Sequence, residues 1–279
     1  MQAATRRSTR IWAAILALSI LLCTCLHAST EVPAGARFAE PSGNGDKTIK
    51  KSGTTIDYGN ASDGYIMVKQ EKGKLRYKMK VSCGDDTLTY DLNNNGDYEV
   101  FPLQLGSGKY KIQVFKQVKG TSYSPVSSSS FKAKLSSKSI VYLYPNQYAW
   151  YTEMFNCVAK SAEVCDGLKS DKEKMDAVFK WCSSRISYDY ILAMTVKAGY
   201  IPDVDEVVEK QMAICFGYAA VMACMLRTQG VPTQLVIGYA DNTYHAWNNV
   251  LIDDKWVRKD ATFASTNATA KKYTEERKY

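Results

Sequence analysis

The spacing of apolar residues changes near residue 139, and this change limits the folds open to the 279-residue chain. Between residues 51 and 138, apolar and polar residues alternate in short runs such as "GYIMVKQ", "KYKIQVFKQV" and "SFKAKL". Turns rich in Gly, Asn and Asp separate these runs, a pattern typical of short antiparallel strands in a sandwich. We therefore predict a small antiparallel β-sandwich-like domain over residues 51–138, with the Ser-rich "SPVSSSS" as one of its loops.

Beyond residue 139 the apolar spacing becomes helical. The segment "SDKEKMDAVFKWCSSRI" opens with a capping box, Ser170 and Glu173, and then places apolar residues on one helical face. A second helix begins at Cys215 in "CFGYAAVMACMLRTQG", and three strand-like runs follow: "TQLVIGYA", "YHAWNNVLI" and "KWVRKDATF". Helices followed by strands predict an α+β domain over residues 139–266. Residues 267–279 read as a polar, solvated tail.

The first 28 residues have the pattern of an export signal. Three arginines precede the apolar run "IWAAILALSILL", and Ala28 follows at a suitable cleavage position. This run is shorter than the ~20 residues of a membrane span, so we expect a secreted or cell-envelope-associated protein without a transmembrane span. A lipid anchor at Cys25 is the less favoured alternative, because Thr24 suits such a site poorly. Residues 29–50, rich in Gly, Pro and polar residues, read as a linker.

The charge of the chain is mildly basic. Removal of the three arginines of the signal lowers the formal net charge from +8 to about +5. This balance is compatible with an anionic surface partner, but it is not that of a nucleic-acid-binding protein. The run "KLRYKMK" places Lys74, Arg76, Lys78 and Lys80 on one face of a strand. That face predicts either contact with an anionic envelope polymer or, more commonly, an ordinary solvated surface.

The cysteines and acidic residues do not indicate a metal site. Six cysteines follow the signal without any Cys-x-x-Cys pair, and one remaining histidine excludes a His-rich site. The segment "DLNNNGDYE" imitates a calcium loop, but Pro102 stands where the bidentate Glu is needed, so we favour a polar hairpin turn. We expect no metal and no cofactor, and the cysteine spacings leave any disulfide pairing open.

His245 is the one histidine outside the predicted signal, since His27 lies within it. Cys215 precedes it at the start of a helix, where unpaired backbone N–H groups and the helix dipole favour a thiolate. Asp260 follows it in the next strand-like run. The order Cys215, His245, Asp260 predicts a nucleophile, a general base and an orienting acid for covalent acyl transfer.

The contact between His245 and Asp260 depends on the length of one turn. If residues 253–254 form a two-residue turn, Ile252 pairs with Lys255, and His245 lies on the same face as Asp260, one diagonal step away. That step is about 7–8 Å between backbones, within reach of the side chains. A three-residue turn would place the two side chains on opposite faces. Each of the three residues alone also has an ordinary structural explanation, as a packed cysteine, a core histidine or a turn aspartate.

The segments "CFGYA", "HAWNNV" and "WVRKDATF" together resemble the transglutaminase-like superfamily, whose members have a papain-like α+β core and a Cys-His-Asp triad in this order. The resemblance covers roughly residues 140–266, and it implies that Cys215 is the nucleophile, His245 the base and Asp260 its orienting partner. The whole chain looks like secreted bacterial proteins that place a β-domain before such a core.

Two positions depart from the pattern of the family. Ala213 stands where a glycine commonly precedes the nucleophile, and Asn249 stands where an acid often follows "HAWN". Neither removes the triad. Gly217, Tyr218 and Trp247 flank the triad and are candidates for contacts with the oxyanion or the substrate.

The chemistry implied by the resemblance is a thioester formed from an amide carbonyl. The backbone N–H of Cys215 is the natural oxyanion donor. We expect a secreted thiol enzyme that attacks peptide or protein amides, cell-wall peptides included, as a cysteine peptidase or amidase. A protein-glutamine transglutaminase, in which an amine replaces water, is the first alternative. A non-catalytic protein that binds the cell envelope is the second.

Overall fold

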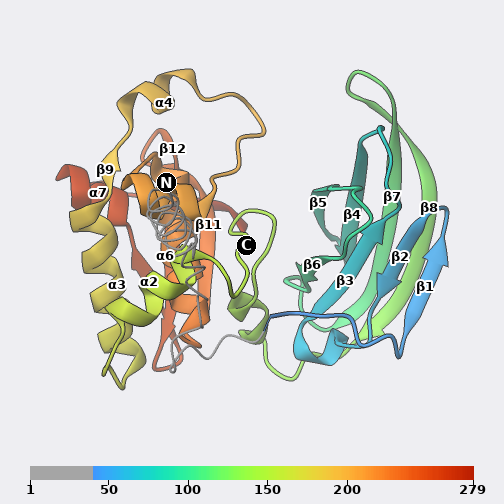
Figure 1. Cartoon of the computed structure of the whole chain (residues 1–279), viewed down its shortest axis with the longest axis horizontal. Helices are drawn as coiled ribbons and strands as arrows, with labels where there is room; N and C mark the ends of the chain where they lie inside the picture. Colours follow the sequence, from blue (N-terminus) through green and yellow to red (C-terminus); the bar gives the residue numbers. More distant parts are fainter. Residues whose placement is uncertain (1–39) are drawn as a thin grey trace, which may run out of the picture. The chain divides into compact units, whose positions relative to one another are not determined.

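The computed structural model describes residues 40–279 of the chain. The predicted export signal, the possible anchor residue Cys25 and the first part of the predicted linker lie outside the described residues. The described part is mixed α+β, with antiparallel sheets first and then helices with a further sheet (Figure 1). No helix of residues 40–279 is long and apolar enough to cross a membrane.

Two four-stranded antiparallel sheets form the part before residue 139, as predicted. The first sheet has the order β1-β2-β3-β6, with the bounds Thr48–Lys51, Thr54–Asp57, Tyr65–Gln70 and Glu99–Pro102. The second has the order β5-β4-β7-β8, with the bounds Asp86–Leu92, Tyr77–Cys83, Gly108–Lys119 and Ser122–Ala133. A short 3-10 helix, η1 (Ala61–Asp63), lies between β2 and β3.

Alternation along the strands explains how these sheets form a core. In β4, Met79 and Val81 are buried while Lys80 between them is exposed, and β7 repeats this pattern. Side chains of the two sheets, among them Val68 of the first and Met79 of the second, belong to one hydrophobic core cluster. Each large apolar side chain buried in this way contributes about 1.5–3 kcal/mol to folding.

Three details of this part differ from the expectations. Strand β1 begins at Thr48, inside the segment read as a linker. The run "SPVSSSS" is not a loop, because it lies within β8 and pairs with β7. The segment "DLNNNGDYE" is not a hairpin turn, because it joins β5 of the second sheet to β6 of the first. In it, the side chains of Asn93 and Asn95 accept from the backbone N–H groups two residues on, which stabilises the bend.

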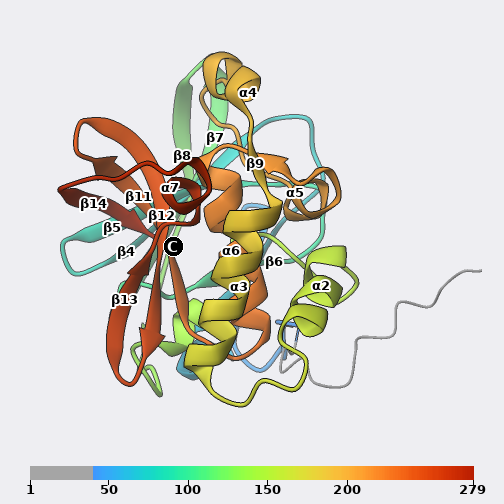
Figure 2. The same ribbon diagram turned by 90° about the vertical axis from the view of Figure 1, so that its left-hand side faces the viewer.

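Helices dominate the segment that follows. After a 3-10 helix, η2 (Ile140–Leu143), the helices are α2 (Asn156–Val164), α3 (Asp171–Arg185), α4 (Tyr190–Thr195), α5 (Val204–Lys210), α6 (Cys215–Thr228) and α7 (Ala261–Thr266). The predicted capping box is confirmed, since Glu173 N donates to Ser170 Oγ (3.2 Å) and Ser170 N donates to Glu173 Oε2 (2.9 Å). Helix α6 is buried from Gly217 to its end and contacts α2, α3, α5 and β12 (Figure 2).

A third antiparallel sheet has the order β13-β12-β11-β14. Its strands are β11 (Thr233–Ala240), β12 (Thr243–Ile252), β13 (Lys255–Lys259) and β14 (Tyr273–Lys278). The predicted two-residue turn is confirmed, because Ile252 pairs with Lys255 across it. Asp253 and Asp254 have φ values of 48° and 59°, as a type I′ turn requires. The register that puts His245 and Asp260 on one face is therefore present.

Two expectations about the C-terminal region are wrong. The third strand-like run ends at Lys259, because Asp260 caps α7 through Phe263 N, which donates to its Oδ1 (2.9 Å). Residues 267–279 are not a solvated tail, since β14 pairs with β11. The side chains of β14 are mostly exposed, which explains the polar composition. Gly238 permits the close approach, because an added Cβ would lie 2.0 Å from the carbonyl oxygen of Thr274.

Candidate active site

Cys215 stands at the first position of α6, preceded by Ile214 as the N-cap residue. The N–H groups of a first helical turn have no partner within the helix, and the positive end of the dipole favours an anion there. Cys215 is half-buried, whereas four other described cysteines are buried. All six cysteines of the described part are free. Burial raises the pKa of the Cys165 thiol to about 11, so that thiol stays protonated at neutral pH.

A short parallel pair of strands lies beside Cys215. Strand β9 (Ser187–Tyr188) pairs with β10 (Met212–Ala213), so that Tyr188 is opposite Ala213, two residues before the cysteine. Burial, and then the nearby Cys215, raise the pKa of Tyr188. Tyr188 therefore belongs to the surroundings of the thiol, although no motif in the sequence distinguishes it from the other tyrosines.

His245 lies on β12 with its side chain only 4% exposed. Its Nε2 donates to Asp260 Oδ2 at 2.8 Å, and the thiol of Cys215 is near enough to the ring to help raise the pKa of His245. Since Nε2 faces the acid, Nδ1 is the nitrogen left for the thiol. The ring of Phe263 stacks on the imidazole at 4.4 Å between centroids, which limits its rotation.

The surroundings of His245 favour its protonated form. Burial of the ring lowers the pKa of His245, but hydrogen bonds to Asp260 and Cys215, together with their charges, outweigh this effect and raise it to about 9. A carboxylate hydrogen-bonded to the ring stabilises the imidazolium. The arrangement is suited to moving the thiol proton onto the ring at neutral pH.

Asp260 receives hydrogen bonds from three elements. Its Oδ2 accepts from His245 Nε2 (2.8 Å) and from the hydroxyl of Tyr273 (2.9 Å), and its Oδ1 accepts from Phe263 N (2.9 Å). The side chain of Asp260 is 9% exposed. The structure therefore brings together Cys215, His245 and Asp260, although Cys215 and Asp260 are 45 positions apart in the sequence.

The other candidate residues have different surroundings. Trp247 is buried beside His245, with ring centroids 6.2 Å apart. Gly217 packs inside the protein, because an added Cβ would lie 2.6 Å from the Cβ of Ala213. The hydroxyl of Tyr218 is buried and donates to Ile186 O (2.6 Å). Gly217 and Tyr218 therefore pack inside the protein, and their contact with the oxyanion or the substrate stays a prediction.

The two departures from the family pattern are accommodated within the fold. Ala213 is buried against Gly217, away from solvent. Asn249 Nδ2 donates to Glu275 Oε1 (2.7 Å) and to Gln234 Oε1 (3.2 Å). An acid thus contacts position 249 from β14, and the side chain of Asn249 is fixed inside the sheet.

Tyr273 and Phe263 were not expected near the site. Tyr273 lies in the segment read as a tail, and Phe263 lies in the segment read as a strand. The segment "YTEERK" is a weak sequence signal for a strand. The spacing between Asp260 and Phe263 is a weak signal for the start of a helix, because it is the spacing of an N-cap residue and the residue whose N–H it accepts. Neither signal points to a neighbouring histidine, because both contacts depend on tertiary packing.

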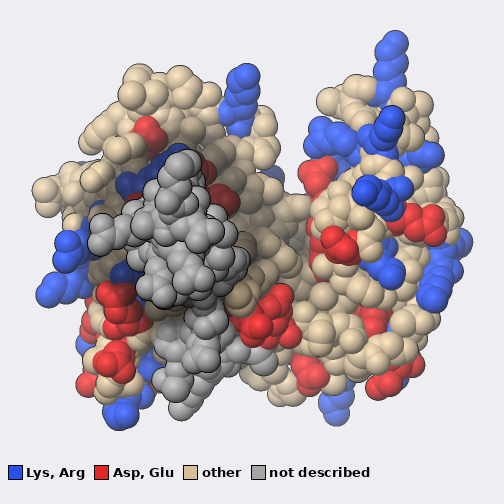
Figure 3. Space-filling model, in the orientation of Figure 1, with Lys and Arg blue, Asp and Glu red and all other residues tan. Residues whose placement is uncertain are grey.

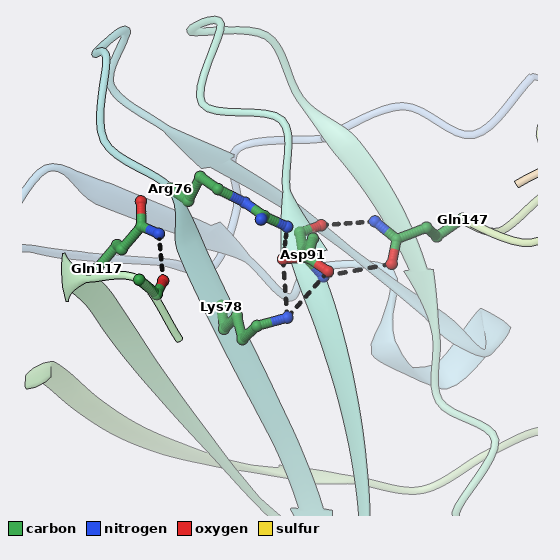
Figure 4. A network of polar contacts seen from close by, with 6 residues as sticks. Arg76, Lys78, Asp91, Gln117 and Gln147 are labelled. Atoms are coloured by element: carbon green, nitrogen blue, oxygen red, sulfur yellow. Dashed lines mark hydrogen bonds and ion pairs between the residues drawn. The ribbon is translucent and has the colours of Figure 1, made fainter. Parts of the chain in front are cut away.

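The predicted basic face of "KLRYKMK" forms only in part. Strand β4 begins at Tyr77, so Lys74 and Arg76 precede it. Lys78 Nζ donates to both carboxylate oxygens of Asp91 (2.9 and 3.0 Å), and Arg76 also contacts this carboxylate (Figure 4). The backbone of Asp91 is in turn held by the side-chain amide of Gln147. Two of the four basic residues are therefore paired with an acid.

Within residues 40–279, no three or more His, Cys, Asp and Glu side chains are grouped to hold a metal ion.

These features define an α+β protein in which a histidine is hydrogen-bonded to an aspartate and lies near a half-buried cysteine. Residues 158–261 match the model of the transglutaminase-like superfamily. A stretch of 119 residues is 29% identical to the kyphoscoliosis peptidase of Mus musculus. That stretch covers 38% of this chain and 18% of the mouse protein. The family match supports an enzymatic function in general.

Solved structures of other proteins align with the chain. One is a Cytophaga hutchinsonii protein described as a candidate cysteine protease, 12% identical over 77% of this chain and 83% of that chain, with a TM-score of 0.42. Another is the red sea bream transglutaminase, 12% identical over 71% of this chain and 48% of that chain, with a TM-score of 0.31. A further transglutaminase is 25% identical over 38% of this chain and 29% of that chain, with a TM-score of 0.32.

Proposed function

We propose that the protein is a thiol-dependent enzyme that hydrolyses amide bonds of peptides or proteins through an acyl-enzyme thioester. One observation carries this proposal: the imidazole of His245 is hydrogen-bonded to the carboxylate of Asp260, and the thiol of Cys215 is near enough to the ring to help raise its pKa. A thiol becomes an effective nucleophile when an adjacent base takes its proton, and the base needs a third group to orient it.

In the proposed reaction, Nδ1 of His245 takes the proton of the Cys215 thiol as the sulfur attacks the amide carbonyl carbon. The carbonyl oxygen becomes an oxyanion, for which the backbone N–H of Cys215 is the proposed donor. The C–N bond then breaks, and the imidazolium gives its proton to the leaving amine. Water attacks the thioester in the second half of the reaction, with His245 again as the base, and releases the acid and the free thiol.

The experiment that tests this proposal compares wild type with Cys215→Ala on a peptide library. We expect cleavage products from wild type and none from the variant. The same proteins are treated with iodoacetamide near neutral pH, and the alkylated positions are mapped by mass spectrometry. If Cys215 labels no faster than the half-buried Cys83, no activated thiol is present and the enzyme proposal fails. Unchanged function in Cys215→Ala would instead support the non-catalytic envelope-binding alternative.

The acceptor separates hydrolysis from transglutamination. A primary amine is added to the same peptide library, and the product masses are compared with and without it. We expect products that carry water in both cases. Amine joined to glutamine with release of ammonia would replace our proposal by the transglutaminase alternative, while leaving the role of Cys215 intact.

We also propose that the protein acts outside the cytoplasm, on the basis of the signal-like first 28 residues. Peptide amides of the cell wall are then among its possible substrates. N-terminal sequencing of the protein recovered from expressing cells should begin just after Ala28. Recovery with Met1 intact, or with a lipid on Cys25, would refute plain secretion.

We propose that a second surface binds an anionic polymer. Lys80, Lys109, Lys111 and Lys132 lie on one outer face of the second sheet, which we name the outer lysine face. Figure 3 shows lysine and arginine side chains over the strands of this part, with acidic side chains among them. Lys109 and Lys132 are direct cross-strand neighbours, and like charges in such positions destabilise a sheet. A bound polyanion would offset that repulsion.

Binding to a heparin column at low salt tests the outer lysine face. The triple substitution Lys109→Gln, Lys111→Gln and Lys132→Gln should elute at clearly lower salt than wild type, because fewer phosphate- or sulfate-like charges are neutralised. The matched control replaces three lysines of the helical part, Lys172, Lys180 and Lys210, by Gln. Equal shifts in the two triple variants would mean that only net charge matters, and this surface would carry no binding site.

A further inference from the structure

Tyr273 of β14 shares an acceptor atom with His245. The phenol oxygen lies 2.9 Å from Asp260 Oδ2, the same oxygen that His245 Nε2 contacts at 2.8 Å. The other carboxylate oxygen accepts from Phe263 N. Three elements, β12, β14 and α7, thus converge on one carboxylate, and each contributes one donor.

The phenol ring is itself fixed from two sides. The ring of Trp247 meets it edge-on, with 5.0 Å between centroids and 75° between planes. The guanidinium of Arg258 lies over its face at 3.9 Å from the centroid. Tyr273 is also paired with Ala240 of β11, so its backbone is held in the sheet. The hydroxyl therefore has little freedom to leave the carboxylate.

We propose that Tyr273 is a positioning residue that sets the proton affinity of His245 through Asp260, so that the C-terminal strand is part of the active site. This proposal rests on the proposed function, because it concerns the base of that reaction. The hydroxyl proton is the positive end of a dipole directed at Oδ2. It attracts part of the negative charge on Oδ2, so that Oδ2 interacts less strongly with the imidazolium. The same hydrogen bond fixes the orientation of the carboxylate plane.

The charged groups around this cluster keep Tyr273 a neutral donor. Burial, followed by the hydrogen bond to Asp260 and its charge, raises the pKa of Tyr273 well above its ordinary value, and Asp241 acts in the same direction. Arg258 opposes them. The groups that face His245 itself are Asp260 and, from α6, Cys215. Glu275 of the same strand is engaged elsewhere, by Asn249 and Lys278.

The variant Tyr273→Phe lacks the hydroxyl that donates to Asp260 Oδ2, so this oxygen keeps only its hydrogen bond from His245 Nε2. The imidazolium should then hold its proton more tightly. We expect the pKa of His245, followed by NMR of its Cε1 proton, to rise by about 0.5–1 pH unit, a threefold to tenfold change in proton affinity. The chain has two histidines, so His27→Gln identifies the second resonance if it is present.

The matched control is Tyr110→Phe, in strand β7 of the second sheet. It removes a buried hydroxyl that donates to Leu103 O and Gly106 O. It should leave the titration of His245 unchanged. The decisive experiment repeats Tyr273→Phe in the Asp260→Asn background. If Tyr273 acts through Asp260, the shift caused by Tyr273→Phe should disappear there.

Each outcome has one meaning. A shift of the same size in the Asp260→Asn background, or no shift in Tyr273→Phe alone, would overturn the proposal for Tyr273. Rapid alkylation of Cys215 in wild type would still support the proposed enzyme in either case. Slow alkylation of Cys215 in wild type would refute the proposed function, whatever the titration of His245 shows in the Tyr273 variant.

Discussion

The substitution Asp260→Asn tests the proposed active site most directly. It keeps the shape of the side chain and an oxygen for the cap of α7, where Phe263 N donates. It removes the negative charge that faces His245 Nε2. The amide nitrogen of asparagine can donate to Nε2, which would leave the imidazole proton on Nδ1, facing the thiol. In that tautomer the ring cannot take the proton of Cys215.

The size of the effect follows from the surroundings of His245. The pKa of His245 is raised to about 9 although burial lowers it, and Asp260 supplies the largest favourable contact. Without that contact we expect the pKa to fall by about two pH units, which corresponds to about 3 kcal/mol. The rate at which Cys215 is alkylated near neutral pH should then fall by up to ~100-fold, since each 1.4 kcal/mol is a factor of ten.

The assay is the rate of alkylation of Cys215 by iodoacetamide, measured across pH by mass spectrometry. The buried cysteines Cys157, Cys182 and Cys224 report unfolding in the same sample. The control is Asp57→Asn, which alters a buried aspartate that accepts from Gly45 N and Gly59 N, remote in the sequence from the site. An alkylation rate within twofold of wild type in Asp260→Asn would refute the pairing of thiol, ring and acid.

Three further predictions concern stability. Because the pKa of His245 is raised in the folded protein to about 9, its protonated ring stabilises the fold fully below pH ~6.5, and this contribution is lost as the pH rises through about 9. The urea midpoint of wild type should therefore exceed that of His245→Gln by the largest amount at low pH. A difference between the two midpoints that stays constant from pH ~6 to ~10 would contradict this prediction. Gly238→Ala should lower the free energy of unfolding by about 1–3 kcal/mol, because its Cβ would lie 2.0 Å from the oxygen of Thr274; an unchanged urea midpoint would show that β14 adjusts at no cost. Ser170→Ala should remove about 1 kcal/mol by deleting the cap of α3, and Ser170→Asp should restore most of it in the same measurement.

Local patterns accounted for much of the fold. The alternation before residue 139 predicted the antiparallel sheets, and the capping box at Ser170 predicted the start of α3. The register of the β12–β13 hairpin followed from a two-residue turn, because side chains in paired strands alternate with a period of two. These features depend on residues close together in the chain, which is why a single sequence reveals them.

Features that depend on distant partners were misread. The polar segment 273–278 becomes an edge strand only because β11 offers free backbone groups and Gly238 leaves room for it. The Ser-rich run of β8 is a strand because β7 pairs with it along its length. Polar composition alone predicts a loop or a tail in both cases, since the pairing partner is remote in the sequence.

The sequence by itself determined which three residues could carry thiol chemistry, through the scarcity of histidine and the motifs around Cys215, His245 and Asp260. Only the tertiary structure decided what surrounds them. It brought Tyr273 to the carboxylate, stacked Phe263 on the imidazole, and buried the small and aromatic neighbours of Cys215 inside the protein. The reason is physical: proton affinity depends on hydrogen bonds and burial within a few ångströms, and packing, not chain position, sets those distances.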